Sequence, residues 1–528
     1  MRARATLLGV LATILALALA IPGGALASSR QEMILQDDQQ LIYAPSQQVA
    51  GTLQTLHAMG VDRVRVSVVW SLIAPHPTSG KRPRFNATNP AAYPNGVWFR
   101  WDFLDRVARQ VGIKVYFQPT APAPTWATPP RQLPQGYRYS HDPNAKDFGQ
   151  FVQAVAKRYN GHYVAAGVNG ASSTLPRVSY WGIWNEPNIG GWMTPQWKTI
   201  RGGKKVPASP AIYRAMVNAA WRGLVATGHR RDTILIGETA AYGASHKGYG
   251  ASMDPLIFTR AFYCAGTNYK PLKGKAATNI GCPKSGSRRR FVRANPALFD
   301  APGWAHHPYD FVNPPSFHRR DPNSATLSNL ARIQTTLDRA RRAYHKRPGI
   351  PIYITEWGIQ SRNPSPYVKF SQAQQAEYLN EGEYMAWGKR RVPAFSQFLL
   401  VDAGPNPHYR KGSKPYWATF QSGLLFFGSQ QPKPAYYAFE LPIWLPHPKH
   451  GPHVFVWAQI RPLNAPRTAL LQFQARGSTT WTNLTTVSSS NPEGFLTTHV
   501  SLPSAGELRM SWTGPGNTVL YSRTASVK

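Results

Sequence analysis

Short apolar runs alternate with longer amphipathic segments along most of the chain, from about residue 31 to residue 445. The amphipathic segments, for example 147–162 and 210–228, carry apolar residues at helical spacing. Strands that alternate with helices in this way usually form a parallel sheet. The predicted strands are MILQ (33–36), VDRVRVSVVW (61–70), IKVYFQPT (113–120), VSYWGIW (178–184), TILIGE (233–238), GWAHHPYD (303–310), IPIYITEWG (350–358) and FSQFLLVD (395–402).

Eight strand candidates, each followed by a helix candidate or a long loop, predict an α/β fold, a (β/α)8 barrel over residues 28–446. The segment PKPAYYAFELPIW (432–444) follows the eighth strand and is expected to form a closing helix. A doubly wound open sheet is the structural alternative. It is disfavoured because no glycine-rich phosphate loop follows the first strand.

The pattern changes after the Pro/His-rich segment LPHPKHGPH (445–453). Six short segments of alternating apolar and polar residues follow, separated by Gly, Pro, Ser and Asn. They predict a small antiparallel β-sandwich domain over 447–528. Trp457, Trp481 and Trp512 lie in this domain, and a packing role is favoured over glycan binding for each of them.

The first 27 residues have the composition of a secretory signal peptide. Arg2 and Arg4 precede a short apolar run, and Ala25-Leu26-Ala27 is a small-residue cleavage site. The apolar run is too short for a comfortable membrane span, and no later segment offers 18 consecutive apolar residues. We therefore expect a secreted, extracellular protein with no integral membrane segment once the signal is removed.

Export affects the interpretation of the two cysteines. Cys264 and Cys282 lie in a Gly/Lys-rich segment, and an oxidising compartment favours a disulfide between them. A metal site would need further Cys or His close by, and a nucleophilic Cys would need a partner; neither is present. We expect no metal and no cofactor.

The chain is strongly basic, with 60 Lys+Arg against 24 Asp+Glu and a net charge of +36. Such an excess can attract nucleic acid, anionic cell-wall polymer or acidic polysaccharide. The basic residues are scattered, and their densest runs, 287–293 and 338–348, are expected to be solvated faces. No nucleic-acid-binding motif is found. We expect a monomer with no nucleic-acid partner and at most weak electrostatic association with anionic cell-wall polymer.

Three glutamates end predicted strands: Glu186, Glu238 and Glu356. The carboxyl ends of the strands hold the active site of a (β/α)8 barrel, and two carboxylates that face each other suit glycoside hydrolysis. The aromatic residues before Glu186 would raise its pKa, and Arg65 would keep Glu356 ionised. Structural ion pairing is the alternative role for these residues. The spacing alone does not decide whether Glu238 or Glu356 opposes Glu186.

The motifs WNEPN (184–188) and ITEWG (354–358), on the fourth and seventh strand runs, resemble those of glycoside hydrolase clan A. This clan comprises the retaining barrel enzymes of the family 5 and family 39 type. The resemblance covers most of 31–445. It implies that Glu186 is the acid/base, that Glu356 is the nucleophile, and that Asn185 binds the sugar 2-hydroxyl.

The resemblance also assigns roles to residues on other strands. Arg65 matches the arginine beside the nucleophile, and His307 with Tyr309 matches a polar pair on the sixth strand. Without the resemblance, His307 would be interpreted as a core histidine. Glu238 is left as a substrate-binding residue or as support for the catalytic residues.

Two positions depart from the clan pattern. The third strand run lacks a histidine that many family 5 members carry, and the eighth lacks the usual tryptophan. Trp126, Trp357 or Trp417 is expected to supply an aromatic platform for the sugar instead. These departures leave the exact family and the sugar open. The sequence predicts a retaining β-glycoside hydrolase of a polysaccharide or oligosaccharide, with a non-catalytic carbohydrate-binding protein on a degenerate barrel as the alternative.

Overall fold

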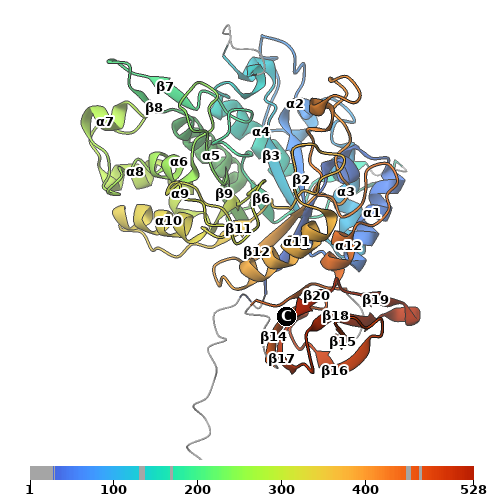
Figure 1. Ribbon diagram of the computed structural model, residues 1–528. Coiled ribbons are helices and arrows are strands. Elements are labelled where there is room, and N and C mark those ends of the chain that lie inside the picture. Colours follow the sequence, from blue (N-terminus) through green and yellow to red (C-terminus); the bar gives the residue numbers. More distant parts are fainter. Residues whose placement is uncertain are drawn as a thin grey trace, which may run out of the picture.

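Eight parallel strands form the central sheet of the computed structural model, in the order β11-β10-β9-β6-β3-β2-β1-β12 (Figure 1). Each of the eight predicted runs overlaps one of these strands, so that prediction is confirmed. The strands are β1 (Glu32–Gln36), β2 (Arg63–Val69), β3 (Lys114–Thr120), β6 (Tyr180–Gly182), β9 (Thr233–Ala240), β10 (Gly303–His307), β11 (Ile352–Ile354) and β12 (Ala394–Phe398).

The first and last strands of this order close the sheet into a ring. At the start of β11, the backbone N–H of Ile352 donates to the carbonyl of Arg391 (2.8 Å). At the other end, the N–H of Phe398 donates to the carbonyl of Trp357 (2.7 Å). The predicted (β/α)8 barrel is therefore confirmed, and the open-sheet alternative is excluded.

The structure describes residues 28, 30–129, 137–166, 170–446, 453–462 and 467–527. The predicted signal segment, 1–27, lies outside the described residues. Among the helices that are described, none is both long and apolar enough to cross a membrane. Cys264 and Cys282 form the predicted disulfide.

Helices surround the barrel as an outer layer (Figure 1). The expected closing helix, 432–444, is shorter than predicted: α12 ends at Glu440, and Ile443–Trp444 form strand β13. Pro442 explains the difference, because a proline disfavours helical backbone in the residue before it. The helices are α1 (Ser46–Ala58), α2 (Trp70–Ile73), α3 (Phe99–Val111), α4 (Ala145–Arg158), α5 (Ser209–Ala226), α6 (Pro255–Phe262), α7 (Gly274–Thr278), α8 (Arg288–Ala294), α9 (Pro296–Asp300), α10 (Ala331–Ala343), α11 (Gln372–Trp387) and α12 (Pro434–Glu440).

The period of two along a strand places polar side chains inside the barrel. In β2, Val64, Val66 and Val68 belong to the large core shared with the helices. Arg63 and Arg65 alternate with them and therefore point inward. Both arginines are buried, and both are paired with carboxylates. The interior also holds a small apolar cluster, formed by Ile34, Tyr116, Leu235, Ala305, Tyr353 and Ala394.

The C-terminal strands form two antiparallel sheets around a separate core, as predicted. Trp512 is buried in the core of this domain, and Trp457 is buried where it packs against Tyr384 and Trp387 of α11, in agreement with the packing role expected of them. The strands are β13 (Ile443–Trp444), β14 (His453–Gln459) and β17 (Phe495–Ser501) in one sheet, and β15 (Thr468–Ala475), β16 (Thr482–Ser488), β18 (Gly506–Thr513), β19 (Val519–Tyr521) and β20 (Ala525–Val527) in the other.

The β-sandwich packs against the barrel on the side away from the carboxyl ends of the strands (Figure 1). Gly60, just before β2, lies against the backbone of Arg461: a side-chain Cβ at Gly60 would meet the Arg461 carbonyl oxygen at 2.2 Å. Arg461 also forms a buried ion pair with Glu383 of α11 (2.7 Å). The outer hairpins β4 (Val164–Ala166) with β5 (Ser172–Thr174), and β7 (Trp197–Thr199) with β8 (Lys205–Pro207), complete the described strands.

Candidate active site

Five charged side chains from different strands converge near the carboxyl ends of the barrel strands. Arg65 lies within β2, Glu238 within β9, and His307 is the last residue of β10. Glu186 lies shortly after β6, which ends at Gly182, and Glu356 lies shortly after β11, which ends at Ile354. In a barrel these strand ends open into one cleft, so segments far apart in sequence supply a single site.

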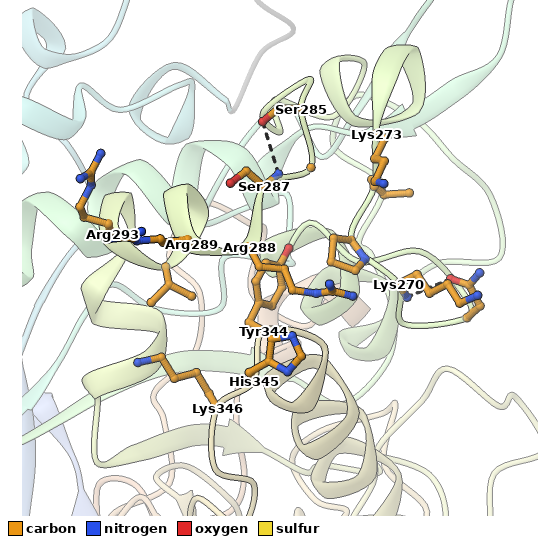
Figure 2. A pocket seen from close by; sticks show the side chains of 15 residues that line it. Lys270, Lys273, Ser285, Ser287, Arg288, Arg289, Arg293, Tyr344, His345 and Lys346 are labelled. Carbon is orange, nitrogen blue, oxygen red and sulfur yellow. Dashed lines mark hydrogen bonds between the residues drawn. The ribbon is translucent and has the colours of Figure 1, made fainter.

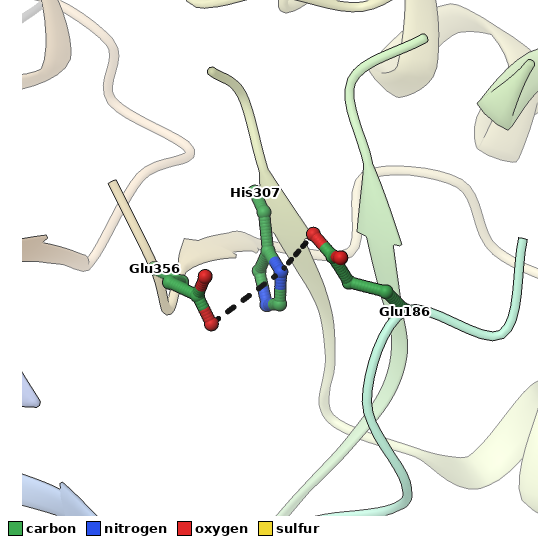
Figure 3. Close-up of side chains that lie close together, drawn as sticks. All are labelled: Glu186, His307 and Glu356. Carbon is green, nitrogen blue, oxygen red and sulfur yellow. Dashed lines mark hydrogen bonds and ion pairs between the residues drawn. The ribbon is translucent and has the colours of Figure 1, made fainter. Parts of the chain in front are cut away.

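Glu186, His307 and Glu356 lie close to one another (Figure 3). One carboxylate oxygen of each glutamate and one ring nitrogen of His307 are all within 4.8 Å of each other. The Nδ1 atom of His307 is 3.0 Å from Oε1 of Glu186 and 3.9 Å from Oε2 of Glu356. The two carboxyl groups are the partly accessible members, with 16% and 10% of their side chains exposed, whereas His307 is fully buried.

Arg65 holds Glu356 from below. Its Nη1 donates to Oε2 of Glu356 (2.9 Å) and to the side-chain oxygen of Gln36. Its Nη2 donates to Oδ1 of Asn185 (2.9 Å) and to Oε2 of Glu238 (3.1 Å). The guanidinium therefore fixes two carboxylates and two amides at once, which a lysine ammonium could not do in this planar arrangement.

Glu238 lies beneath the two accessible glutamates and is fully buried. It accepts hydrogen bonds from Arg65, from Thr355 (3.0 Å) and from the hydroxyl of Tyr116. Gly182 leaves the space for this contact, because a Cβ there would lie 2.6 Å from Oε1 of Glu238. Because Glu238 is fully buried, it is not exposed to a ligand in this structure, and its supporting role stays a prediction.

The histidine is held in its charged form. Burial alone would lower the pKa of His307, but the Glu356 carboxylate and the hydrogen bonds to Glu186 and Glu238 raise it to about 9. Both ring nitrogens then donate: Nδ1 to Glu186, and Nε2 to Oε2 of Glu238 at 2.9 Å. The neighbouring His306 behaves in the opposite way, because burial lowers its pKa to about 4.

The charge balance identifies which glutamate is protonated. Glu238 and Glu356 each pair with Arg65, and burial of Glu238 is outweighed by Arg65 and His307, so that its pKa is lowered. Glu186 has no direct contact with Arg65. Its burial raises its pKa, and the hydrogen bond to His307 only partly opposes this effect. Two cations thus balance two carboxylates, and Glu186 is the group that can keep a proton.

A cavity of about 360 Å³ opens over the two glutamates. This volume falls within the ordinary range for small-molecule sites, roughly 300–1,000 Å³. Aromatic rings from Tyr242, Tyr309, Phe311 and Phe420 line its walls. The hydroxyl of Tyr309 donates to Oε1 of Glu356 (3.1 Å), so it helps to fix that carboxyl group at the cavity.

The tryptophans expected to form a platform do not line this cavity. Trp357 is 1% exposed and packs against Phe395 in the core. Trp126 is 8% exposed, and its Nε1 donates to the carbonyl of Pro75. Trp417 packs edge-on against Tyr416 and Phe427, outside the lining of the cavity.

The sequence interpretation also missed several residues of the site. Phe311 and Phe420 lie on long connections after β10 and β12, whose paths the strand pattern does not predict. Two polar residues had a usable signal, because a polar side chain inside an apolar strand run points to a buried partner. These are Tyr116, in register with Arg65, and Gln118, which donates to the backbone carbonyl of Trp184 and to Asn185.

Three non-glycine residues near the site have left-handed backbone conformations: Trp184 (φ +67°), Glu186 (φ +35°) and Glu238 (φ +47°). Such conformations cost about 1–3 kcal/mol each and persist only where the surroundings fix them. Trp184 is fixed by hydrogen bonds from its backbone N–H to Pro119 and from its indole to Trp192. Strain of this kind concentrates at sites whose side chains must be aimed precisely.

By distance alone, Glu186, His307 and Glu356 could each offer one atom to a metal ion. Their present bonding makes them a poor ligand set. Oε2 of Glu356 already accepts from Arg65, and Nδ1 of a charged His307 has no free lone pair. A metal ion would have to displace that proton and lie beside a guanidinium.

No family model and no curated protein sequence matches the chain. Among solved structures, it is similar to a glucosidase from Croceicoccus marinus, with 12% identity over 94% of this chain and 97% of that chain and a TM-score of 0.47. It is also similar to a GH39 β-xylosidase from Caulobacter crescentus, with 14% identity over 91% of this chain and 95% of that chain and a TM-score of 0.46. A GH39 enzyme from Xanthomonas axonopodis pv. citri is 13% identical over 91% of this chain and 93% of that chain, with a TM-score of 0.45.

Proposed function

We propose that the protein is a retaining O-glycosyl hydrolase that cleaves β-glycosidic bonds in a polysaccharide or oligosaccharide. One observation carries the proposal: Glu186 and Glu356 direct carboxylate oxygens to within 4.8 Å of each other at the same cavity. Retaining enzymes keep their two carboxyl groups about 5–5.5 Å apart, whereas inverting enzymes need roughly 6.5–9.5 Å to fit a water molecule between carboxylate and sugar.

In the first step, Oε2 or Oε1 of Glu356 attacks the anomeric carbon, and the bond from that carbon to the leaving oxygen breaks. Glu186 donates its proton to the leaving oxygen. Arg65 and the Tyr309 hydroxyl donate hydrogen bonds to Glu356 and keep its carboxyl group aimed at the cavity. The products of this step are the released alcohol and a glycosyl ester on Glu356.

In the second step, Glu186 is a carboxylate and takes a proton from water. The oxygen of that water bonds to the anomeric carbon, and the bond to Glu356 breaks. The charged ring of His307 donates to Oε1 of Glu186 throughout, so it stabilises the carboxylate that exists between the two steps. Glu186 regains its proton and the cycle closes.

The substrate class follows from the shape and polarity of the cavity. Aromatic walls suit the flat apolar faces of sugar rings. Asn185 directly precedes Glu186, which lines the cavity. Arg65 and Gln118 hold the side-chain oxygen of Asn185, which leaves its amide nitrogen to donate to a sugar hydroxyl.

We propose secretion as well, because residues 1–27 have the composition of a signal peptide. We also propose weak electrostatic association with anionic cell-wall polymer, because the net charge is +36.

The proposal is tested by following hydrolysis of a panel of aryl β-glycosides by NMR. The first sugar released should have the β configuration, and Glu356→Gln should lose activity by about 10⁴-fold or more. Initial release of the α anomer would show that the mechanism is inverting and not retaining. If the wild-type protein binds oligosaccharides but turns none over, the carbohydrate-binding alternative is correct.

The separate roles of the two glutamates can be tested with azide and an activated aryl β-glycoside. In Glu356→Ala, azide can occupy the vacated space and attack from the nucleophile's side, giving an α-glycosyl azide. In Glu186→Ala, the glycosyl ester still forms, and azide releases it as a β-glycosyl azide. A β-glycosyl azide from Glu356→Ala and an α-glycosyl azide from Glu186→Ala would show that the two roles are reversed.

A further inference from the structure

Three basic segments, within residues 268–273, 285–293 and 344–346, form one hollow on the flank of the barrel, which we call the basic hollow (Figure 2). Its volume is about 1160 Å³. It lies beside α7, α8 and the end of α10, away from the active-site cavity, with which it shares no residue. The six Lys and Arg side chains that line it are Lys270, Lys273, Arg288, Arg289, Arg293 and Lys346.

The walls of the basic hollow are built from ordered segments. The disulfide Cys264–Cys282 closes the segment that carries Lys270 and Lys273. Ser287 begins α8, where its hydroxyl accepts from the backbone N–H of Arg290 (3.4 Å). The side chain of Arg288 reaches across to the end of α10, where its Nε donates to the carbonyl of Ala343 (2.6 Å).

The charge in the basic hollow is not balanced by the protein. No acidic side chain is among the described residues that line it. None of its six Lys and Arg residues makes an ion pair with a carboxylate in the described part of the chain. Like charges gathered in a concave surface repel one another and concentrate the positive potential there, so an anionic ligand would be attracted strongly.

We propose that the basic hollow binds an anionic glycan, a polysaccharide that carries repeated carboxylate or sulfate groups. Its size and its number of cations suit several anionic groups along one chain rather than a single small ion. Arginine forks bind such groups in pairs of hydrogen bonds, and the hydroxyls of Ser285 and Ser287 add neutral donors at the rim.

The basic hollow is less suited to single-stranded nucleic acid, which proteins bind by stacking bases on aromatic rings. Its tyrosine, Tyr344, is 4% exposed and donates its hydroxyl to the carbonyl of Tyr263 (2.7 Å). The imidazole of His345 is therefore the one exposed aromatic ring among the described residues that line the hollow. The site does not depend on the proposed glycosidase activity. It would hold the protein on an acidic polysaccharide whether or not that polysaccharide is cleaved.

Binding to the full chain can be measured by fluorescence anisotropy with labelled oligogalacturonate, sulfated dextran and neutral dextran. The test variant is Lys270→Ser/Arg289→Ser/Arg293→Ser. The matched control is Lys198→Ser/Arg201→Ser/Lys204→Ser, which removes the same charge from exposed positions on the β7–β8 hairpin. We expect at least a tenfold loss of affinity for an anionic glycan in the test variant and less than a threefold loss in the control. Added salt should weaken binding in every case.

A second measurement uses the wild-type protein, so its result does not depend on whether the variants fold. Bound oligogalacturonate or sulfated dextran should protect Lys270, Lys273 and Lys346 from acetylation, but not Lys198 or Lys204, as quantified by mass spectrometry. The preferred glycan distinguishes carboxylate from sulfate ligands. Equal loss in the two variants, equal binding of neutral dextran, or tighter binding of DNA through the same residues would each overturn the proposal.

Discussion

The Nδ1 atom of His307 lies 3.0 Å from Oε1 of Glu186, although 121 residues separate them in the chain. The same ring reaches the buried Glu238 through Nε2, at 2.9 Å. Because His307 is fully buried and charged, both of its ring nitrogens donate, and the ring links the accessible Glu186 to the buried carboxylate of Glu238. This relationship controls how readily Glu186 holds its own proton, and it can be tested through the pH dependence of activity.

Replacing the charged ring with a neutral side chain should change the pH profile in a defined direction. His307 lowers the pKa of Glu186, so His307→Asn should let burial raise that pKa further. The alkaline limb of the kcat/KM profile should therefore move to higher pH, and the maximum should fall. His306→Asn is the matched control, because His306 is neutral at working pH. A limb that moves to lower pH, or moves equally in both variants, would contradict the assignment.

The hydroxyl of Tyr309 should contribute to catalysis through its hydrogen bond to Glu356. Hydrogen bonds to charged groups are worth about 1.5–3 kcal/mol, so Tyr309→Phe should lower kcat/KM by about tenfold to a hundredfold. Tyr242→Phe is the control in the same cavity wall. Steady-state kinetics on one aryl glycoside compare the two, and equal effects would show that Tyr309 acts only as part of the wall.

Glu238 should stabilise the fold in a pH-dependent way. Its pKa is lowered, despite burial, by Arg65 and His307, so it contributes stability above its unfolded pKa of about 4.5 and loses it as the pH falls through the lower folded value. Glu238→Gln should reduce the free energy of unfolding at pH 7 by about 3–5 kcal/mol. The difference from wild type should shrink in acid, as measured by denaturant unfolding at several pH values.

A partly exposed ion pair provides the control for this prediction. Arg82 and Asp147 are 2.8 Å apart, with 34% and 12% of their side chains exposed. Asp147→Asn should cost only about 0–1 kcal/mol, because exposed pairs are weakened by solvent. A cost for Glu238→Gln no larger than this would mean that the buried network does not stabilise the fold.

Asp105, which lies outside the active site, should affect the stability of the fold with the opposite pH dependence. It is 2% exposed, its Oδ2 accepts no hydrogen bond, and burial together with Asp102 raises its pKa from 3.8 to about 8. The folded state therefore retains a proton that the unfolded chain has lost, and stability falls as the pH rises between these two values.

Asp105→Asn should raise the free energy of unfolding by about 1–3 kcal/mol at pH 8–9 and should change it little near pH 4. Asp102→Asn should destabilise instead, because Asp102 accepts from Arg158 and Tyr159. Thermal unfolding across this pH range measures both effects. A stabilisation by Asp105→Asn that does not depend on pH would contradict the raised pKa.

The sequence predicted the barrel well because its strands have a local signal. Apolar runs of the right length and spacing mark each strand, and helical periodicity marks most of the segments between them. The same local signal placed Glu186, Glu238 and Glu356 at strand ends. It failed at the connections: Trp357 immediately follows the predicted nucleophile, yet its ring points into the core, while Phe311 and Phe420 reach the cavity from long loops.

What the sequence determined by itself is therefore the set of strands and the chemistry available at their ends. The tertiary structure, in contrast, determines which of these side chains come into contact. Glu238 and Glu356 are equivalent by spacing, but the closed ring buries one beneath Arg65 and directs the other to Glu186. The basic hollow likewise joins segments around residues 270, 289 and 346, whose separate charges had suggested only solvated faces. Both outcomes depend on distances across the fold, and local periodicity carries no information about those distances.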